Sequence, residues 1–138
     1  QATILRTKLT HLRAWTARRR EIAGRYLADI VHPDVRLPQE PTGTASSWHL
    51  FVVRCERRDE LQHHLTNLGV GSGVHYPIPP HRQPAYAADF AAGDFPNATA
   101  WCDQALSAPI GPHLTDDQVT RVIDAVNSFR AGDVTHNV

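Results

Sequence analysis

The segment from Gly73 to Tyr86 holds four of the ten prolines of this chain, and it constrains the backbone more than any other stretch. Each proline fixes φ and removes a backbone donor, so the segment forms a stiff turn that holds its side chains in place. Two histidines and two tyrosines lie on this turn. A rigid polar loop at a strand end is typical of a substrate-facing wall. The same composition also fits a proline-rich edge connection whose histidines are merely solvated.

Length and composition indicate one ordinary globular domain. The chain has 138 residues, of which 41% are hydrophobic and 20% charged. Basic and acidic residues balance at 14 each, so no overall charge recruits nucleic acid or a membrane surface. No apolar run in the sequence approaches the roughly 20 residues of a membrane helix. Cys55 and Cys102 follow no paired motif and predict buried thiols in a reducing, cytoplasmic compartment.

A long amphipathic helix is predicted at the start of the chain. Apolar side chains recur at helical spacing from Ile4 to about Ile30, and Pro33 follows. Arginines occupy much of the remaining surface of this helix. Because Glu21 and Asp29 interrupt them, we interpret that face as solvated and not as a nucleic-acid site.

Three shorter helices are predicted after it. Leucines at helical spacing mark residues 58–68, with Gly69 as the C-terminal stop. Pro96 suits the first turn of a helix that runs to about Leu106. The pattern from Thr115 to Gln118 is a capping box that opens the last helix. The apolar stripe of that helix consists of Val119, Val122, Ile123, Val126 and Phe129.

The strand signals predict an α+β fold with a small, mostly antiparallel sheet and helices packed against it. Residues 48–54 are apolar on both alternating faces, as in a strand that is covered on both sides. Residues 70–76 form a second candidate strand, in which Gly71 and Gly73 permit close approach of another group. Residues 107–110 are a short extended piece.

The histidines do not form a recognisable metal site. His49, His75 and His81 lie in different predicted elements, and no cysteine or carboxylate cluster completes a tetrahedral set. His63 and His64 are adjacent and point about 100° apart around their helix. We therefore predict that both are surface residues. No phosphate-binding glycine loop or nucleophile elbow is present in the sequence.

Several short motifs occur along the chain in a fixed order. They are Gln1–Leu9, Trp48–Arg54, Gly69–Pro84, Phe95–Pro96, Leu106–Pro109 and Leu114–Gln118. In this order they resemble the C-terminal part of the DegT/StrS family of sugar-nucleotide aminotransferases, which use pyridoxal phosphate. The loop signature, with a His-Tyr-Pro run followed by a further histidine, glutamine and proline, is the most specific of these motifs.

The resemblance implies the C-terminal small domain of a fold-type I aminotransferase over residues 1–130, including the inter-domain helix at about 4–30. Residues 131–138 are expected to form a frayed tail. Such enzymes transfer an amino group from glutamate, or a similar donor, to a keto-sugar carried on a nucleotide. The motif match implies that His75 and Tyr76 face the sugar nucleotide. It places His81 behind them, as support or as a second contact.

The resemblance also implies what this chain lacks. The cofactor lysine and the cofactor-binding residues belong to the N-terminal large domain of the family, so no catalytic or cofactor-binding residue is expected here. The only lysine, Lys8, matches an ordinary helix position. We expect the chain to be inactive alone, an excised piece of a homodimeric enzyme with Ile4, Leu5 or Trp15 uncovered. The alternative is a non-catalytic ligand-binding or interaction module derived from the same scaffold.

Overall fold

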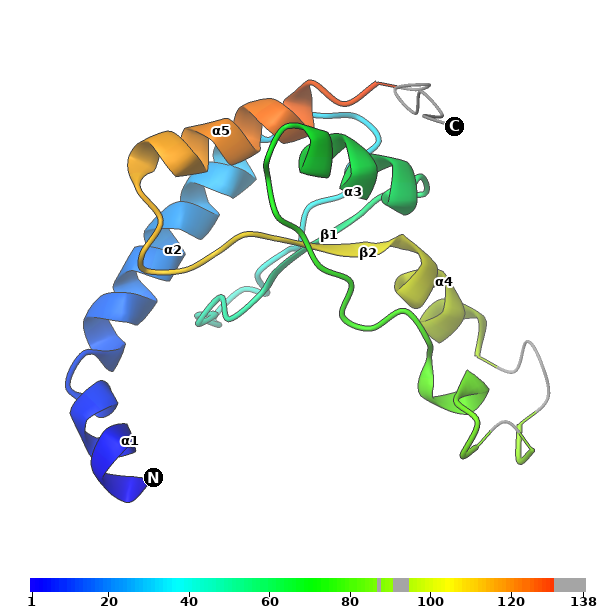
Figure 1. Cartoon of the computed structure of the whole chain (residues 1–138), viewed down its shortest axis with the longest axis horizontal. Helices are drawn as coiled ribbons and strands as arrows, with labels where there is room; N and C mark the ends of the chain where they lie inside the picture. The colour runs from blue at the N-terminus through cyan, green and yellow to red at the C-terminus, as the bar shows by residue number, and fades with distance from the viewer. Residues whose placement is uncertain (87, 91–94, 131–138) are drawn as a thin grey trace.

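The computed structural model describes residues 1–86, 88–90 and 95–130. Strands β1 and β2 form a two-stranded antiparallel sheet, with Phe51 opposite Ala108 and Arg54 opposite Ala105. The predicted α+β class with a small antiparallel sheet is confirmed. The elements in chain order are α1 (Ala2–Leu9), α2 (Leu12–Asp29), β1 (Phe51–Arg54), α3 (Arg58–Asn67), the 3-10 turn η1 (Pro80–Arg82), α4 (Pro96–Gln104), β2 (Ala105–Ala108) and α5 (Asp116–Asn127) (Figure 1).

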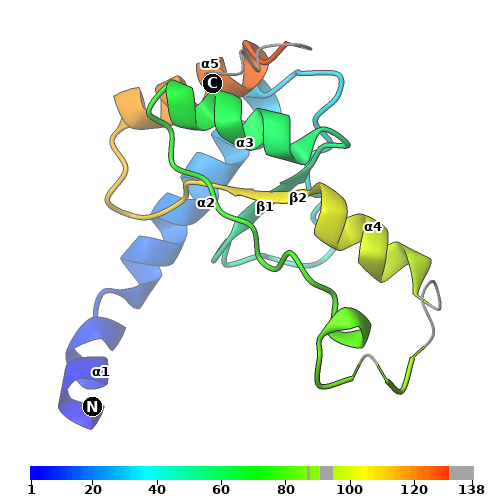
Figure 2. The ribbon, with the colours of Figure 1, turned by 45° about the vertical axis from the view of Figure 1, so that its right-hand side comes forward.

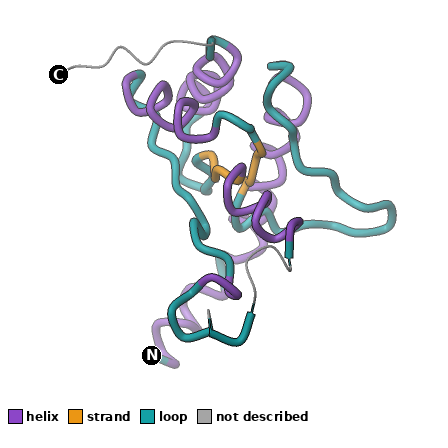
Figure 3. The backbone as a smooth tube through the Cα atoms, turned by 90° about the vertical axis from the view of Figure 1, so that its right-hand side faces the viewer, coloured by secondary structure: helices purple, strands orange, loops and turns teal. Residues whose placement is uncertain are grey.

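The helices surround the sheet and leave two projections. Helix α5 packs against α2 and α3, and α3 packs against β2. The strands lie in the middle of the molecule with helices around them (Figure 3). Two segments extend away from this centre in both Figure 1 and Figure 2. We call them the α1 arm, which is Ala2–Leu9, and the loop arm, which comprises the described residues between 75 and 104.

One hydrophobic cluster holds the centre together, with contributions from α2, β1, α3, β2 and α5. The rings of Tyr26 and Phe51 meet edge to face at 5.0 Å, and the Tyr26 hydroxyl donates to the Pro109 carbonyl at 2.8 Å. Burial of apolar surface, at roughly 25 cal/mol per Å², is the main stabilising contribution of such a cluster. Its largest fully buried side chains are Tyr26, Phe51, Phe129, Ile22, Leu61, Leu65 and Leu106.

Helix α5 begins and packs as the sequence predicts. The Gln118 amide donates to Thr115 Oγ1, and Gln118 Oε1 accepts from the Thr115 amide, which completes the capping box. The predicted apolar stripe of α5 is buried throughout, from Val119 to Phe129. The acidic residue Asp116 lies in the first turn, where Arg18 of α2 lowers the pKa of its carboxyl group.

Helix α3 ends at the predicted glycine. Gly69 has φ +72°, in the left-handed region that glycine adopts without steric cost. The Val70 amide donates to the Leu65 carbonyl at 2.8 Å and the Gly69 amide to the Thr66 carbonyl at 2.9 Å. These two bonds form a Schellman motif, so Gly69 is confirmed as the helix stop.

The prediction of one continuous helix over about 4–30 is wrong, because the helix breaks at Thr10 and His11. The Thr10 hydroxyl donates to the Thr7 carbonyl at 2.7 Å, in competition with the helical backbone. The His11 amide donates to the Lys8 carbonyl, three residues back instead of four. The result is two helices, α1 and α2.

The predicted strands are shorter in the structure. Strand β1 begins only at Phe51, and Trp48 at the start of the predicted strand has φ 49°, outside the β region. Only one face of β1 is fully covered, since Val52 and Arg54 are half-buried. The second predicted strand, over 70–76, is reduced to a single bridge between Gly73 and Ser107.

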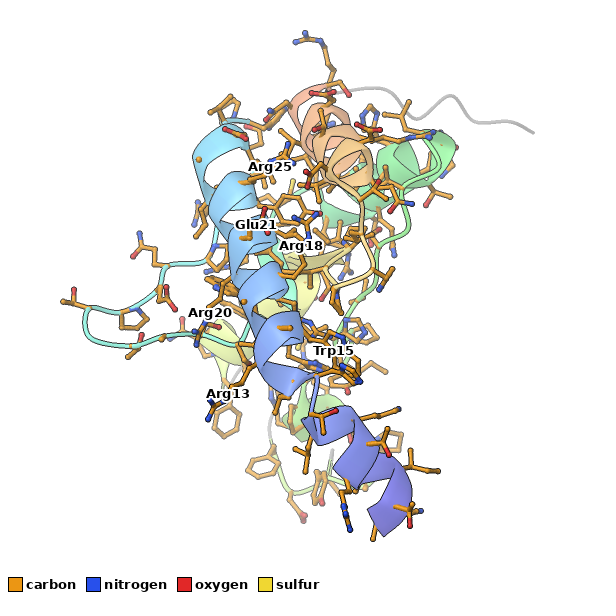
Figure 4. All side chains as sticks on the ribbon, turned by 90° about the vertical axis from the view of Figure 1, so that its left-hand side faces the viewer. Arg13, Trp15, Arg18, Arg20, Glu21 and Arg25 are labelled. Atoms are coloured by element: carbon orange, nitrogen blue, oxygen red, sulfur yellow. The ribbon has the colours of Figure 1, made fainter. Side chains whose placement is uncertain are left out.

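Three arginines of α2, namely Arg18, Arg20 and Arg25, bond to other elements and are not simply solvated (Figure 4). Arg18 donates to Asp116 at 2.7 Å, and Arg25 donates to the Thr120 hydroxyl at 2.7 Å, so both join α2 to α5. Arg20 donates to a carbonyl of the loop that precedes β1 at 2.8 Å. Because guanidinium groups carry several donors in a fixed geometry, each can bond a backbone carbonyl or a carboxylate of another element.

Two predictions about burial are wrong in part, one for the histidine pair and one for the cysteines. His64 is half-buried, with Nε2 3.0 Å from the Ala125 carbonyl, so it joins α3 to α5, whereas His63 is exposed. Cys55 is buried as predicted, but Cys102 is only partly buried. Within the described residues, no helix is long and apolar enough to cross a membrane. The predicted frayed tail, 131–138, lies outside the described residues.

Candidate functional site

The proline-rich loop is anchored to the sheet at Gly73. The Gly73 amide donates to the Ser107 carbonyl at 3.1 Å, and the Ser107 amide donates back to the Gly73 carbonyl at 2.8 Å. This isolated antiparallel bridge fixes the start of the loop against β2. The loop therefore leaves the sheet from a defined point.

His75 and Tyr76 follow this anchor after Val74 and lie together at the surface. The Nδ1 atom of His75 is 2.9 Å from Ser107 Oγ. The His75 ring meets the Tyr76 ring edge to face at 5.8 Å, and the peptide bond between the two residues is cis. The Tyr76 side chain is 73% exposed. Two of the three predicted site residues thus present an imidazole and a phenol to the outside of the loop arm.

Gly73 shows which group makes the close approach that the sequence predicts. A Cβ atom at this position would lie 2.9 Å from His75 Cε1, closer than real Cβ contacts. The approaching group is therefore the imidazole of the same loop. The sequence identifies Gly73 as a position of close approach. It identifies neither the approaching group nor Ser107. The available signal is a single hydroxyl within the otherwise apolar strand β2.

His81, the third predicted site residue, lies inside the loop arm. It sits in η1, where the Arg82 amide donates to the Pro79 carbonyl and closes the turn. The His81 side chain is only 6% exposed, and its ring lies 5.0 Å from that of Phe95. Its Nε2 atom is 3.4 Å from the Thr99 hydroxyl, so His81 links the turn to α4.

An open apolar hollow of about 450 Å³ lies on the loop arm above His81. Sequence reasoning does not single out its aromatic residues as a pocket, because they are separated along the chain and meet only when η1 folds against α4. Aromatic and apolar lining of this kind suits a flat, weakly polar group. The lining residues are Pro80, His81, Tyr86, Phe90, Phe95 and Ala98.

The residues that the structure describes do not fit a pyridoxal phosphate site. Lys8 lies on the exposed α1 arm, in a shallow apolar groove that it lines with leucines and Trp15. The groove offers neither a carboxylate for a pyridine nitrogen nor backbone amides at a helix start for a phosphate. Lys8 is the only lysine in the chain, so no other residue of this chain can carry the cofactor as a Schiff base.

A second, polar hollow of about 260 Å³ lies at the far end of β1 and is lined by several arginines. Two of these arginines are paired with carboxylates of the protein, Arg57 with Glu60 at 2.7 Å and Arg36 with Glu56 at 3.8 Å. Arg54 donates to the neutral Gln104 Oε1 at 2.6 Å. Within the described part of the chain, no group of three or more His, Cys, Asp or Glu side chains is arranged to hold a metal ion. The loop arm is therefore the candidate functional site.

Comparison with known proteins identifies relatives of the whole chain. The sequence matches the profile of the DegT/DnrJ/EryC1/StrS aminotransferase family over residues 1–127. It is 46% identical over 131 residues to the dTDP-3-amino-3,4,6-trideoxy-alpha-D-glucose transaminase of Streptomyces venezuelae, covering 94% of this chain and 35% of that protein. It is 40% identical over 129 residues to the dTDP-3-amino-3,6-dideoxy-alpha-D-galactopyranose transaminase of Aneurinibacillus thermoaerophilus, with coverages of 94% and 35%.

Solved structures agree with the sequence comparison. The fold matches S. venezuelae DesV in complex with a ketimine intermediate with a TM-score of 0.89 and 46% identity, over 92% of this chain and 35% of that chain. It matches an aminotransferase of the same family from Brucella abortus with a TM-score of 0.82 and 31% identity, over 95% and 35% of the two chains. The chain thus spans about a third of these relatives, and it belongs to the DegT/DnrJ/EryC1/StrS aminotransferase family.

Proposed function

We propose that this chain is the substrate-facing C-terminal portion of a pyridoxal-phosphate-dependent aminotransferase that aminates a nucleotide-linked keto-sugar. Glutamate, or a similar amino acid, is the donor. The observation that carries this proposal is the 46% identity over 131 residues to a dTDP-sugar transaminase, which includes the loop arm. In this proposal residues 1–130 form the small domain of a homodimeric, cytoplasmic enzyme.

In this proposal His75 and Tyr76 contact the nucleotide sugar. An imidazole nitrogen and a phenolic hydroxyl supply the donors and acceptors that sugar hydroxyls and diphosphate oxygens require. Their exposure on a loop that is bridged to β2 supports this role. His81, buried against Phe95, supports the loop from below instead of contacting the substrate directly.

The cofactor belongs to the part of the enzyme outside this chain. Pyridoxal phosphate, when bound, supplies the electron sink for amino-group transfer. In this proposal the residues that hold the cofactor come from an N-terminal large domain, and the exposure of Lys8 on the α1 arm supports this. The same domain covers the apolar side chains of α1, among which Ile4 is 62% and Leu9 63% exposed.

The contribution of His75 can be separated from the chemistry at the cofactor by measuring the two half-reactions of the intact enzyme. We expect His75→Ala and Tyr76→Phe each to raise KM for the sugar nucleotide while the half-reaction with glutamate changes little. Loss of one such hydrogen bond costs about 1–3 kcal/mol, or roughly 5- to 150-fold in affinity.

The matched control is His63→Ala, which removes an exposed histidine from α3 and should alter neither half-reaction. Equal damage to both half-reactions in the His75 variant, together with a lower Tm, would remove the recognition role. In that case His75 would serve only to hold the loop.

A non-catalytic role is the second candidate, because two relatives carry sensory or regulatory names. The chain is 36% identical over 133 residues to a pleiotropic regulatory protein of Geobacillus stearothermophilus. Under this alternative the loop arm binds a ligand or partner without turnover. Binding of dTDP to the intact protein, with no amino transfer from any amino acid tested, would favour it over the aminotransferase.

A further inference from the structure

The imidazole of His75 is fixed by the two residues of the bridge that anchors the loop. Side chains two residues apart on an extended chain share a face, so the His75 ring folds back over Gly73. It reaches across the bridge to Ser107, with Nδ1 2.9 Å from Oγ. The Tyr76 ring meets the His75 ring edge to face at 5.8 Å.

The Ser107 hydroxyl is a buried polar group among apolar side chains of β2. Ser107 is 5% exposed, and Ala105, Leu106 and Ala108 beside it in β2 are apolar and buried. A buried hydroxyl without a partner is costly, so buried hydroxyls are almost always hydrogen-bonded. The side-chain partner of the Ser107 hydroxyl is His75, which lies 32 residues away in the sequence.

Gly73 provides the space for the ring. A Cβ atom there would lie 2.9 Å from Cε1 and 3.6 Å from each ring nitrogen of His75. The imidazole itself would have to move, because the contact is with a planar ring that is already bonded to Ser107. Any larger residue at position 73 therefore separates the ring from its hydroxyl partner.

We propose that Ser107 and Gly73 are positioning residues for His75. The Ser107 hydroxyl donates to Nδ1 of the neutral imidazole, and Gly73 leaves room for this geometry. A neutral imidazole carries one proton, and the partner of one nitrogen decides which nitrogen holds it. Donation to Nδ1 therefore fixes the Nε2–H tautomer.

The fixed tautomer gives the loop a defined donor. His75 is exposed, and no residue in the described part of the chain hydrogen-bonds Nε2, so among these residues the N–H is left for an acceptor oxygen of a bound ligand. Under the proposed function that oxygen belongs to the sugar or the diphosphate of the nucleotide sugar. The identity of the ligand rests on the proposed function, whereas the position and tautomer of the imidazole do not.

The tautomer can be read directly by long-range ¹H–¹⁵N correlation spectra of the protein labelled with ¹⁵N-histidine, at pH 8, above the ordinary histidine pKa of about 6.5. We expect His75 in the unmodified protein to show a protonated Nε2 and an unprotonated Nδ1. A protonated Nδ1 overturns the proposal without the need for any variant.

Variants then test both positioning residues. Ser107→Ala should turn the single tautomer of His75 into a mixture with averaged shifts, and Ser107→Thr, which keeps the hydroxyl, should restore it. Gly73→Ala should have the same effect as Ser107→Ala although the serine is intact. His63, exposed on α3, should be unchanged in all three variants. Unaltered His75 shifts in both Ser107→Ala and Gly73→Ala overturn the proposal.

Binding of dTDP to the intact enzyme separates this proposal from the proposed function. We expect Ser107→Ala to weaken binding about fivefold, the loss that corresponds to one hydrogen bond, and to add nothing in a His75→Ala background. Binding that depends on His75 but not on Ser107 overturns the positioning role and leaves the function standing. A fixed tautomer in a protein that binds no nucleotide keeps the positioning role and removes the function.

Discussion

The centre of this molecule and its two arms bury their apolar side chains very differently. In the centre, Phe51, Leu61 and Phe129 are at most 1% exposed. In the α1 arm, Leu9 is 63% exposed, and in the loop arm Tyr76 is 73% exposed. Both arms project from the centre in Figures 1 and 2.

The difference in burial distinguishes the part of the chain that forms the folded core from the two parts that expose apolar side chains. Large exposed apolar patches in a globular protein mark surfaces that bind something else. The centre is completed by its own helices and sheet, whereas each arm presents exposed apolar side chains at the surface. In our proposal the partner of the α1 arm is the large domain and that of the loop arm is the nucleotide sugar.

The largest expected effect on stability comes from removing a buried aromatic ring from the centre. Phe51→Ala removes a ring that packs on Tyr26 and Trp48, and it should lower the free energy of unfolding by about 3–5 kcal/mol. The matched arm variant, Leu5→Ala, should change it by no more than about 0.5 kcal/mol. Urea unfolding of the two variants measures both values. Similar losses would show that the α1 arm is part of the same cooperative core.

A second test measures the free energy of unfolding as the pH is raised into the alkaline range. Burial raises the pKa of Tyr26 from 10.0 to about 12, which favours the neutral phenol in the folded state. The stabilisation is therefore complete below pH 10 and is lost as the pH rises from 10 to 12. Tyr26→Phe, which also loses the bond to Pro109, should cost about 1 kcal/mol at neutral pH and flatten this decline.

The control for this alkaline measurement is Tyr76→Phe, since Tyr76 lies exposed on the loop arm. It should leave the loss of stability between pH 10 and 12 as it is in the unmodified protein. A decline that persists in full in Tyr26→Phe would assign it to other groups.

The smallest effect on stability is expected for substitutions in the α1 arm. Their main effect should be on self-association of the chain. Leu5 and Leu9 are about 60% exposed, so the chain alone should self-associate through them. Replacing both with glutamate should reduce self-association in sedimentation experiments and leave the unfolding midpoint nearly unchanged. A chain that is already monomeric at high concentration would contradict an uncovered interface on α1.

Local signals predicted those parts of the fold that depend on neighbours in sequence. The capping box at Thr115 and the stop at Gly69 are complete within a few residues, and both were predictable. The break at Thr10 was not, because the helical pattern of apolar residues continues through it. His64 was misassigned because its partner, the Ala125 carbonyl, lies on another helix.

The residues of the candidate site also differ in how well the sequence could predict them. A dense motif marked His75, Tyr76 and His81, but only the fold shows that His81 is buried. Ser107 could not be connected to His75 from the sequence, since they meet across a bridge between distant segments. The cofactor residues and the large domain were expected from the family resemblance alone, and they remain proposals.

The most direct test of the central claim is a chimera with the S. venezuelae transaminase to which this chain is 46% identical. Residues 1–130 of this chain replace the matching C-terminal third, and amino transfer to the nucleotide-linked keto-sugar is measured. We predict a chimera that binds pyridoxal phosphate, turns over the sugar nucleotide and loses affinity for it in the His75→Ala variant. A folded chimera that carries the cofactor and accepts an amino group from glutamate, but transfers none to any nucleotide sugar tested, would contradict the account.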